Sequence, residues 1–142
     1  MHKKGTVITG TIGVDAHIVG TRIVQYALEK AGFEVVPLGT FVSQEEFIRA
    51  AVETDADAIF ISSIYGQAEL DCVGLREKFI EAGLNDIILY LGGNIATEYK
   101  PETWRQIEKK FKAMGFDRVY PPGTTPSVAI KDLEKDLGIV EE

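Results

Sequence analysis

The chain has 142 residues, of which 45% are apolar and 26% charged, a composition typical of one globular domain with one sizeable core. Lys and Arg number 15 against 22 Asp and Glu, so the formal net charge is −7, and nucleic acid and anionic membranes are poor partners. The single cysteine, Cys72, excludes a disulfide within the chain and a cysteine-based zinc site. No apolar run approaches the length of a membrane span, and the first residues do not resemble a signal peptide. We expect a soluble, cytoplasmic protein with a single domain over residues 1–142.

Predicted strands and helices alternate along the chain. Short apolar runs predict strands over residues 6–12, 33–38, 56–62, 87–91 and 118–120. Longer periodic runs predict helices over residues 18–31, 44–54, 68–82 and 101–114, and from Thr125 or Ser127 to about Gly138. Ser43 and Glu46 form a capping-box pattern at the start of the second helix.

This alternation predicts an α/β fold with parallel strands joined by right-handed crossovers. Five strand–helix units suggest a flavodoxin-like, doubly wound five-stranded sheet of order 2-1-3-4-5, with helices on both faces. In such sheets a ligand binds outside the carboxyl ends of the strands, where the strand order reverses. The segments to search are therefore residues 13–20, 62–67, 92–97 and 121–125.

The first of these segments holds Asp15 and His17, with Gly20 closing it. Histidine is the commonest ligand of transition metals, and a nearby carboxylate that accepts its second ring proton orients the imidazole. The alternative is that Asp15 caps a helix and His17 is an ordinary first-turn residue. The only other histidine is His2, and zinc needs three or four protein ligands. A metal here would therefore have its other positions filled by a macrocycle, as in haem or a corrinoid.

Serines begin the second segment, glycines begin the third, and the fourth contains Thr124. Ser62 and Ser63 either terminate the sheet and satisfy backbone groups or donate a hydrogen bond to a heterocycle lying against it. Gly92 and Gly93 either serve a turn or let a ligand approach the backbone. Thr124 either supports the start of the last helix or contacts a ligand. Each of these signals is weak by itself.

Other families that use this edge of the sheet fit poorly. A phosphoacceptor receiver domain needs an aspartate after the third strand and a lysine after the fifth, where this chain has Ser62 and Tyr120. A flavodoxin needs a hydroxyl-rich phosphate loop after the first strand, whereas residues 13–20 contain no Ser or Thr. The glycine pattern of dinucleotide-binding proteins is absent.

Three motifs in chain order resemble the signature D-x-H-x-x-G, S-x-L, G-G of cobalamin-binding domains, as found in methionine synthase, methylmalonyl-CoA mutase and glutamate mutase. They begin at Asp15, Ser62 and Gly92, each after a predicted strand. Ile64 replaces the usual leucine, a volume-conserving change whose repacking should cost less than ~1.5 kcal/mol. The stretches SIYGQ, DCVGLR and FDRVYPPGT further resemble the small (sigma) subunits of glutamate mutase, or methylaspartate mutase.

The resemblance implies that the cofactor is adenosylcobalamin, with its own benzimidazole displaced. His17 would be the lower axial ligand of cobalt and Asp15 would hold His17 by a hydrogen bond. Ser62 would hydrogen-bond the benzimidazole, and Gly20, with the paired glycines, would leave width for the nucleotide tail. The cofactor-binding residues expected from the resemblance are Val14, Asp15, Ala16, His17, Ile18, Gly20, Ser62, Ser63, Ile64, Gly92, Gly93, Asn94, Ile95, Ala96, Thr97, Gly123 and Thr124.

The resemblance also implies an isomerase component. The adenosyl radical would start the rearrangement of L-glutamate to (2S,3S)-3-methylaspartate, with the substrate on a larger barrel (epsilon) subunit in a hetero-oligomer such as a heterotetramer. The chain would be inactive without that subunit, because its five arginines fall mostly in predicted helices, where we expect solvated side chains. The alternatives are a corrinoid methyl carrier, the cobalamin subunit of another mutase of the methylmalonyl-CoA type, and a flavodoxin-like domain without cofactor.

Overall fold

A computed structural model of the chain describes residues 4–12, 19–63, 68–92, 101–121 and 124–139. Its centre is a five-stranded parallel sheet of order β2-β1-β3-β4-β5, which confirms the predicted topology. The strands are β1 (Thr6–Thr11), β2 (Glu34–Pro37), β3 (Ala58–Ser62), β4 (Ile88–Gly92) and β5 (Arg118–Val119).

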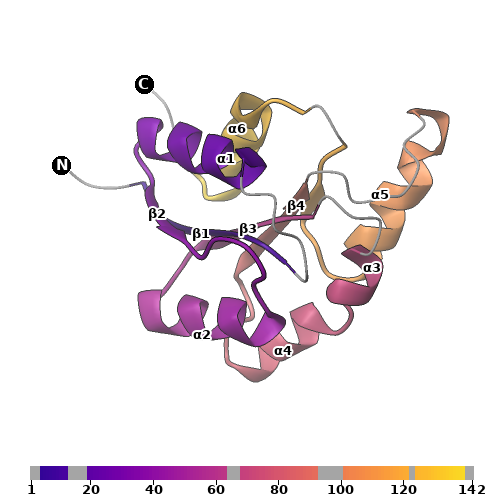
Figure 1. Ribbon diagram of the computed structural model, residues 1–142, viewed down its shortest axis with the longest axis horizontal. Helices are drawn as coiled ribbons and strands as arrows, with labels where there is room; N and C mark the ends of the chain where they lie inside the picture. The colour runs from indigo at the N-terminus through magenta and orange to yellow at the C-terminus, as the bar shows by residue number, and fades with distance from the viewer. Residues whose placement is uncertain (1–3, 13–18, 64–67, 93–100, 122–123, 140–142) are drawn as a thin grey trace.

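The helices cover both faces of the sheet (Figure 1). One layer holds α1 (Val19–Lys30) and α6 (Pro126–Asp136), which lie side by side. The opposite layer holds α2 (Gln44–Thr54), α3 (Ala68–Asp71), α4 (Leu75–Glu81) and α5 (Trp104–Ala113). A short 3-10 helix, η1 (Pro101–Thr103), leads into α5.

Each face of the sheet has its own core, because successive side chains of a strand point to opposite faces. Beneath α1 and α6, the core includes Phe60, Tyr90 and Leu133. On the other face, Ile59, Leu91 and the α2 residue Phe47 belong to a larger core. The strands are therefore apolar on both faces, as expected for a parallel sheet covered on both sides.

Helix α2 shows how local sequence positions an element. Ser43 is its N-cap, and its hydroxyl accepts a hydrogen bond from the Glu46 backbone N–H while the Glu46 carboxylate accepts one from Ser43, so the predicted capping box is confirmed. A β-carbon at Gly10 would lie 3.0 Å from the Phe47 ring. Glycine at this position therefore lets α2 pack directly against β1.

One predicted helix is wrong. The helix expected over residues 68–82 is two helices, α3 and α4, separated by a turn. Gly74 precedes α4 in the left-handed conformation, with φ of 75°, and this conformation ends a right-handed helix. The apolar periodicity continued through the break and so concealed it.

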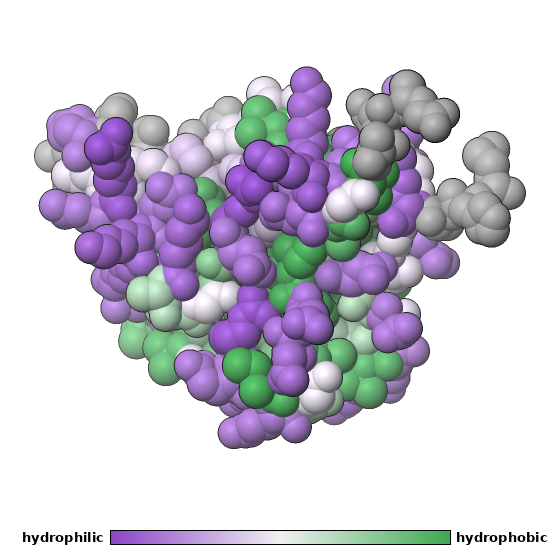
Figure 2. Space-filling model, turned by 180° about the vertical axis from the view of Figure 1, so that it is seen from behind, coloured by the Kyte–Doolittle hydropathy of each residue, from purple (hydrophilic) through white to green (hydrophobic). Residues whose placement is uncertain are grey.

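Among the described residues, no helix is long and apolar enough to cross a bilayer. Seen from behind, the surface is predominantly hydrophilic (Figure 2). Apolar side chains reach it mainly in the lower part, where Figure 1 places the layer of α2 and α4.

Candidate functional site at the carboxyl edge of the sheet

Three strands end at the same level at the edge where α/β proteins bind ligands. In the register of the sheet, Thr11 of β1 lies opposite Ser62 of β3, and Ser62 lies opposite Gly92 of β4. Tyr120 continues the row, because its backbone N–H donates to the Leu91 carbonyl at 2.8 Å. The row therefore holds Thr11, Ser62, Gly92 and Tyr120 on four adjacent strands, with Thr11 fully buried and Tyr120 8% exposed.

Side-chain alternation assigns this row to the face covered by α1 and α6. Phe60 and Tyr90, two residues before Ser62 and Gly92, belong to the core on that face. Ser63 is next in the chain, is 1% exposed, and donates its backbone N–H to the Gly92 carbonyl at 3.1 Å. By the same alternation Ser63 belongs to the opposite face, so Ser62 is the serine that faces α1 and α6.

The row fits a flat heterocycle with a polar edge. Among the residues that the structure describes, a β-carbon at Gly92 would meet the Tyr120 β-carbon alone, at the ordinary contact distance of 3.9 Å. No side chain therefore stands at Gly92, between Ser62 and Tyr120 in the row. A hydroxyl on one side and an aromatic ring on the other are suitable neighbours for a benzimidazole.

Only part of the predicted site lies in the described residues. Gly20 is in the first turn of α1, and Thr124 precedes α6, where its hydroxyl donates to the Pro121 carbonyl at 2.7 Å. With Ser62, Ser63 and Gly92 these are the predicted positions that the structure describes. The others lie outside the described residues: Val14, Asp15, Ala16, His17, Ile18, Ile64, Gly93, Asn94, Ile95, Ala96, Thr97 and Gly123.

The described strand ends that precede these segments lie at one edge of the sheet. Residues 13–18 follow the bridge between Ile12 and Val42 at the end of β1, and residues 64–67 and 93–100 follow the ends of β3 and β4. Among the described residues, no three His, Cys, Asp or Glu side chains gather as ligands for an ion. The assignment of His17 as a cobalt ligand stays a prediction.

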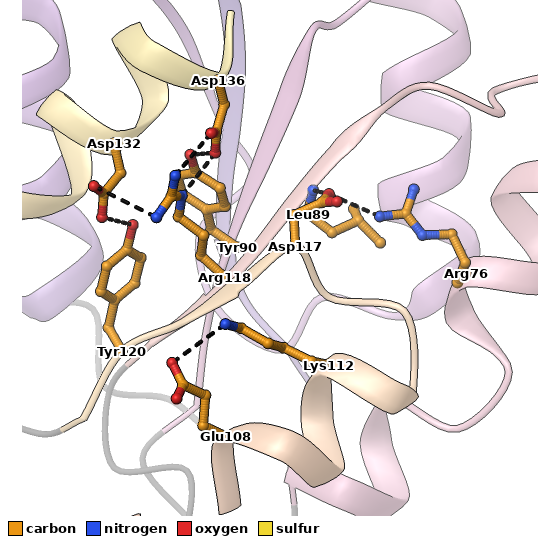
Figure 3. Close-up of polar contacts among 10 residues, drawn as sticks. All are labelled: Arg76, Leu89, Tyr90, Glu108, Lys112, Asp117, Arg118, Tyr120, Asp132 and Asp136. Carbon is orange, nitrogen blue, oxygen red and sulfur yellow. Dashed lines mark hydrogen bonds and ion pairs between the residues drawn. The ribbon is translucent and has the colours of Figure 1, made fainter. Parts of the chain in front are cut away.

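Sequence reasoning missed the two tyrosines that border the site. Phe60, Tyr90 and Tyr120 pack together, with the Phe60 and Tyr120 rings stacked at 6.2 Å and Tyr90 edge-on to both. The Tyr120 hydroxyl donates to Asp132 at 2.8 Å, and the Tyr90 hydroxyl donates to Asp136 (Figure 3). Period-two alternation in β4 and β5 was the signal that could have identified them.

Arg118 connects this aromatic cluster to α6. Its guanidinium donates to both Asp136 carboxylate oxygens at 2.8 Å and lies 3.6 Å from Asp132 (Figure 3). Hydrogen bonding to Arg118 lowers the pKa of Asp136. Burial, followed by the hydrogen bonds to the α6 carboxylates, raises the pKa of Tyr90 and of Tyr120. Both phenols are therefore neutral donors at physiological pH, and they hold α6 against the sheet.

Arg76 corrects the expectation that the arginines are solvated. It donates to the Gly115 carbonyl at 2.9 Å, the Ile87 carbonyl at 2.7 Å and Asp117 at 2.9 Å. A β-carbon at Gly115 would lie 2.4 Å from the β-carbon of Arg76. Arg76 is thus a structural residue, and with Arg118 committed to α6 neither is free to bind a dicarboxylate substrate.

The family model described as "B12 binding domain" matches residues 5–131. The chain is 55% identical to the glutamate mutase sigma subunit of Carboxydothermus hydrogenoformans over 138 residues, covering 97% of this chain and 99% of that one. It is also 55% identical to the glutamate mutase sigma subunit of Clostridium cochlearium over 137 residues, covering 96% and 98%.

Among solved structures, a cobalamin-binding protein from Desulfitobacterium hafniense has the same fold, with a TM-score of 0.74 at 21% identity. The match covers 94% of this chain and 59% of that chain. The sequence motifs, the strand order and the matches over nearly the whole length agree. The chain belongs to the B12-binding domain family and, within it, to the glutamate mutase sigma subunits.

Proposed function

We propose that this chain is the adenosylcobalamin-binding component of a glutamate mutase and acts together with a larger catalytic subunit. The observation that carries the proposal is the row Thr11–Ser62–Gly92–Tyr120, which lies at the edge where the family's signature segments begin. When bound, adenosylcobalamin supplies homolysis of its cobalt–carbon bond, which starts the rearrangement of L-glutamate to (2S,3S)-3-methylaspartate.

The chain's own residues bind and orient in this proposal. His17 would hold the cobalt, and the Asp15 carboxylate would accept the other ring proton of His17, which would fix the tautomer. Ser62 would donate a hydrogen bond to the benzimidazole of the bound cofactor, and Gly92 would leave width for this ring. Tyr120, held by Asp132 on α6, would lie beside this ring next to Gly92.

The substrate site belongs to the partner in this proposal. A dicarboxylic amino acid requires cationic clamps. Of the two arginines that approach β4 and β5, Arg76 is bonded to two carbonyls and Asp117, and Arg118 to Asp136. The chain therefore binds cofactor alone but requires the larger subunit for turnover. A partner over the carboxyl edge also shields reactive species from water.

The test of the ligand assignment is spectroscopic. Chain mixed with adenosylcobalamin should show the visible spectrum of a cofactor whose benzimidazole has left cobalt. In the reduced cobalt(II) form, histidine labelled with the heavy nitrogen isotope should change the nitrogen splitting of the electron paramagnetic resonance signal. His17→Ala should abolish both changes, whereas His2→Ala, the matched control, should behave like the parent chain.

Asp15→Asn should weaken cofactor affinity without abolishing it, because the loss of a carboxylate that orients a ligating histidine typically costs about 10–100-fold. Titration of the chain with cofactor, followed in the visible spectrum, measures this change. If His17→Ala binds with the parent spectrum and isotope splitting, the ligand assignment is wrong. If equilibrium dialysis shows that the parent chain does not bind adenosylcobalamin, the proposed function is wrong.

A further inference from the structure

Three carboxylates, spaced two residues apart along α6, hold this helix against the sheet. They are Asp132, Glu134 and Asp136. Successive residues of an α-helix are about 100° apart around its axis, so Asp132 and Asp136 share one side and Glu134 lies on another. Each of the three is bonded to a residue of the sheet, or of a segment next to it. The helix is therefore held from two sides.

On the first side, a single guanidinium spans a full turn of the helix. Arg118, in β5, donates to both carboxylate oxygens of Asp136 at 2.8 Å, and its remaining terminal nitrogen lies 3.6 Å from Asp132 (Figure 3). The two carboxylates also accept hydrogen bonds from the hydroxyls of Tyr90 and Tyr120. A planar fork that meets two carboxylates four residues apart fixes the position of the helix along its axis.

On the other side, the buried carboxylate of Glu134 pairs with Lys4, two residues before β1. The lysine is itself fixed, because its backbone N–H donates to the Gly32 carbonyl at 3.0 Å. Its ammonium group also lies 5.9 Å from the centre of the Phe33 ring. Rotation of α6 about its axis would therefore break either this pair or the contacts with Arg118.

Apolar burial and these polar contacts contribute differently to the docking of α6. Ala129, Ile130 and Leu133 are buried in the core beneath the helix. Their burial stabilises the docked helix without fixing its exact position, because the hydrophobic effect is non-directional. Hydrogen bonds, in contrast, weaken steeply when their distance and angle change. We therefore expect loss of the Arg118 contacts to leave α6 docked but displaced.

A displacement of α6 would reach the row at the carboxyl edge through Tyr120. The hydroxyl of this residue is bonded to Asp132, and its β-carbon lies 3.9 Å from the place of a β-carbon at Gly92. The start of α6 is also close to the row, because the Thr124 hydroxyl donates to the Pro121 carbonyl at 2.7 Å. The place of the Tyr120 ring beside Gly92 thus depends on where α6 lies.

We propose that Arg118 is a positioning residue for the nucleotide tail of the cofactor. By fixing α6 along its axis, Arg118 holds Tyr120 in place beside the benzimidazole and so sets how tightly the tail binds. This inference rests on the proposed function, in which that ring lies next to Gly92. It adds a role for a side chain that does not touch the cofactor, and this role is confined to the tail.

The test compares two corrinoids that differ only in the tail. Adenosylcobinamide has the corrin and adenosyl group of adenosylcobalamin but lacks the nucleotide. Equilibrium dialysis of the isolated chain gives a dissociation constant for each. Arg118→Lys retains a positive charge but cannot meet both carboxylates. Its dissociation constant for adenosylcobalamin should rise about tenfold, whereas that for adenosylcobinamide should change by less than about twofold.

A double-mutant cycle tests the route through Tyr120 with adenosylcobalamin alone. Tyr120→Phe keeps the ring but removes its hydrogen bond to Asp132. If Arg118 acts through this bond, adding Arg118→Lys to Tyr120→Phe should have less than about twofold further effect on the dissociation constant. At saturating cofactor, the histidine isotope splitting of the cobalt(II) form should stay that of the parent chain in every variant.

Arg49→Lys is the matched control, because Arg49 is exposed on α2 in the opposite layer. It should bind both corrinoids like the parent chain. Circular dichroism and urea unfolding show whether each variant is folded. If Arg118→Lys does not fold, Asp136→Asn replaces it, since this change keeps an acceptor oxygen and removes the charge that the fork meets.

The outcomes separate the two claims. If the parent chain does not bind adenosylcobalamin, the proposed function fails. If the parent binds it and Arg118→Lys has the parent dissociation constant, the positioning inference is wrong. It is also wrong if the variant loses affinity equally for both corrinoids, or if the effects of Arg118→Lys and Tyr120→Phe are fully additive.

Discussion

At the scale of single residues, Cys72 combines full burial with a nearby negative charge. Its thiol is completely inaccessible, and burial, with a smaller contribution from the Asp71 carboxylate, raises its pKa to about 12. The thiolate fraction at pH 8 is then roughly one in ten thousand, and the thiolate is the reactive form. We expect a disulfide reagent such as Ellman's to leave the native chain unlabelled at pH 8, and to label it stoichiometrically in guanidinium.

A matched variant shows whether the reagent can label an exposed thiol in the same chain. In Cys72→Ala with Val73→Cys, the thiol moves one position to a side chain that is 59% exposed in the parent chain, and labelling should be fast. If native Cys72 is labelled rapidly while the circular dichroism spectrum shows that the chain is still folded, Cys72 is not buried as described. The sequence placed Cys72 in the predicted helix over residues 68–82 but did not predict its burial, because a buried environment depends on packing from distant segments.

The two arginines beside β4 and β5 show the same limit of sequence reasoning. Helical spacing predicted a solvated Arg76, yet its acceptors are carbonyls 11 and 39 residues away in the chain. A local sequence pattern cannot predict contacts with residues so distant in the chain. Ser62 and Gly92 could be predicted because they follow recognisable apolar strands, whereas Tyr120 became part of the site only when register placed it beside Gly92.

At the scale of elements, Arg76 fastens α4 to the starts of β4 and β5 (Figure 3). Asp117 extends this connection, because the same carboxylate oxygen accepts from Arg76 and from the Leu89 backbone N–H, each at 2.9 Å. Arg76→Met should lower the free energy of unfolding by about 3 kcal/mol, since three hydrogen bonds from a largely buried charge are lost. Urea denaturation measures this change.

Lys78→Met is the control for that prediction. Lys78 lies on the same helix and pairs with Glu45 at 2.9 Å, but both side chains are exposed, at 42% and 66%. Exposed pairs contribute little to stability, so the urea midpoint should stay near that of the parent. Equal midpoints for Arg76→Met and Lys78→Met would show that the Arg76 hydrogen bonds do not fasten α4.

Element boundaries were predictable where local chemistry defines them. The Ser43 and Glu46 capping box predicted the start of α2, and Pro126 in the first turn of α6 suits a helix start. The division of residues 68–82 into α3 and α4 was not predictable from periodicity. It depends on the left-handed Gly74, and glycine also occurs in turns and within helices.

At the scale of the whole molecule, topology was the most predictable feature. Alternating strands and helices allow few parallel arrangements, because crossovers are right-handed and both faces of the sheet must be covered. The order 2-1-3-4-5 and the site at the carboxyl edge follow from this restriction. The alignment of Thr11, Ser62 and Gly92 does not, since a shift of one residue would turn each side chain to the other face.

The polar cluster on α6 predicts how stability depends on pH. In the folded state the pKa of Asp136 is lowered, mainly through Arg118. The ionised Asp136 therefore stabilises the fold above the unfolded pKa of about 4, and this stabilisation is lost as the pH falls below that value. Burial raises the pKa of Tyr90 and Tyr120. Their contribution is present below the unfolded value of about 10 and is lost as the pH rises above it.

The free energy of unfolding, measured with urea across pH, should therefore be constant near neutrality and should fall in acid and in alkali. The double variant Tyr90→Phe, Tyr120→Phe should lose about 2 kcal/mol near neutrality, because two hydrogen bonds are removed, and its alkaline decline should be shallower than that of the parent. Tyr26→Phe is the control, since Tyr26 is 62% exposed on α1, and should follow the parent profile. Equal alkaline slopes for the double variant and the parent would mean that the two phenols do not couple α6 to the sheet.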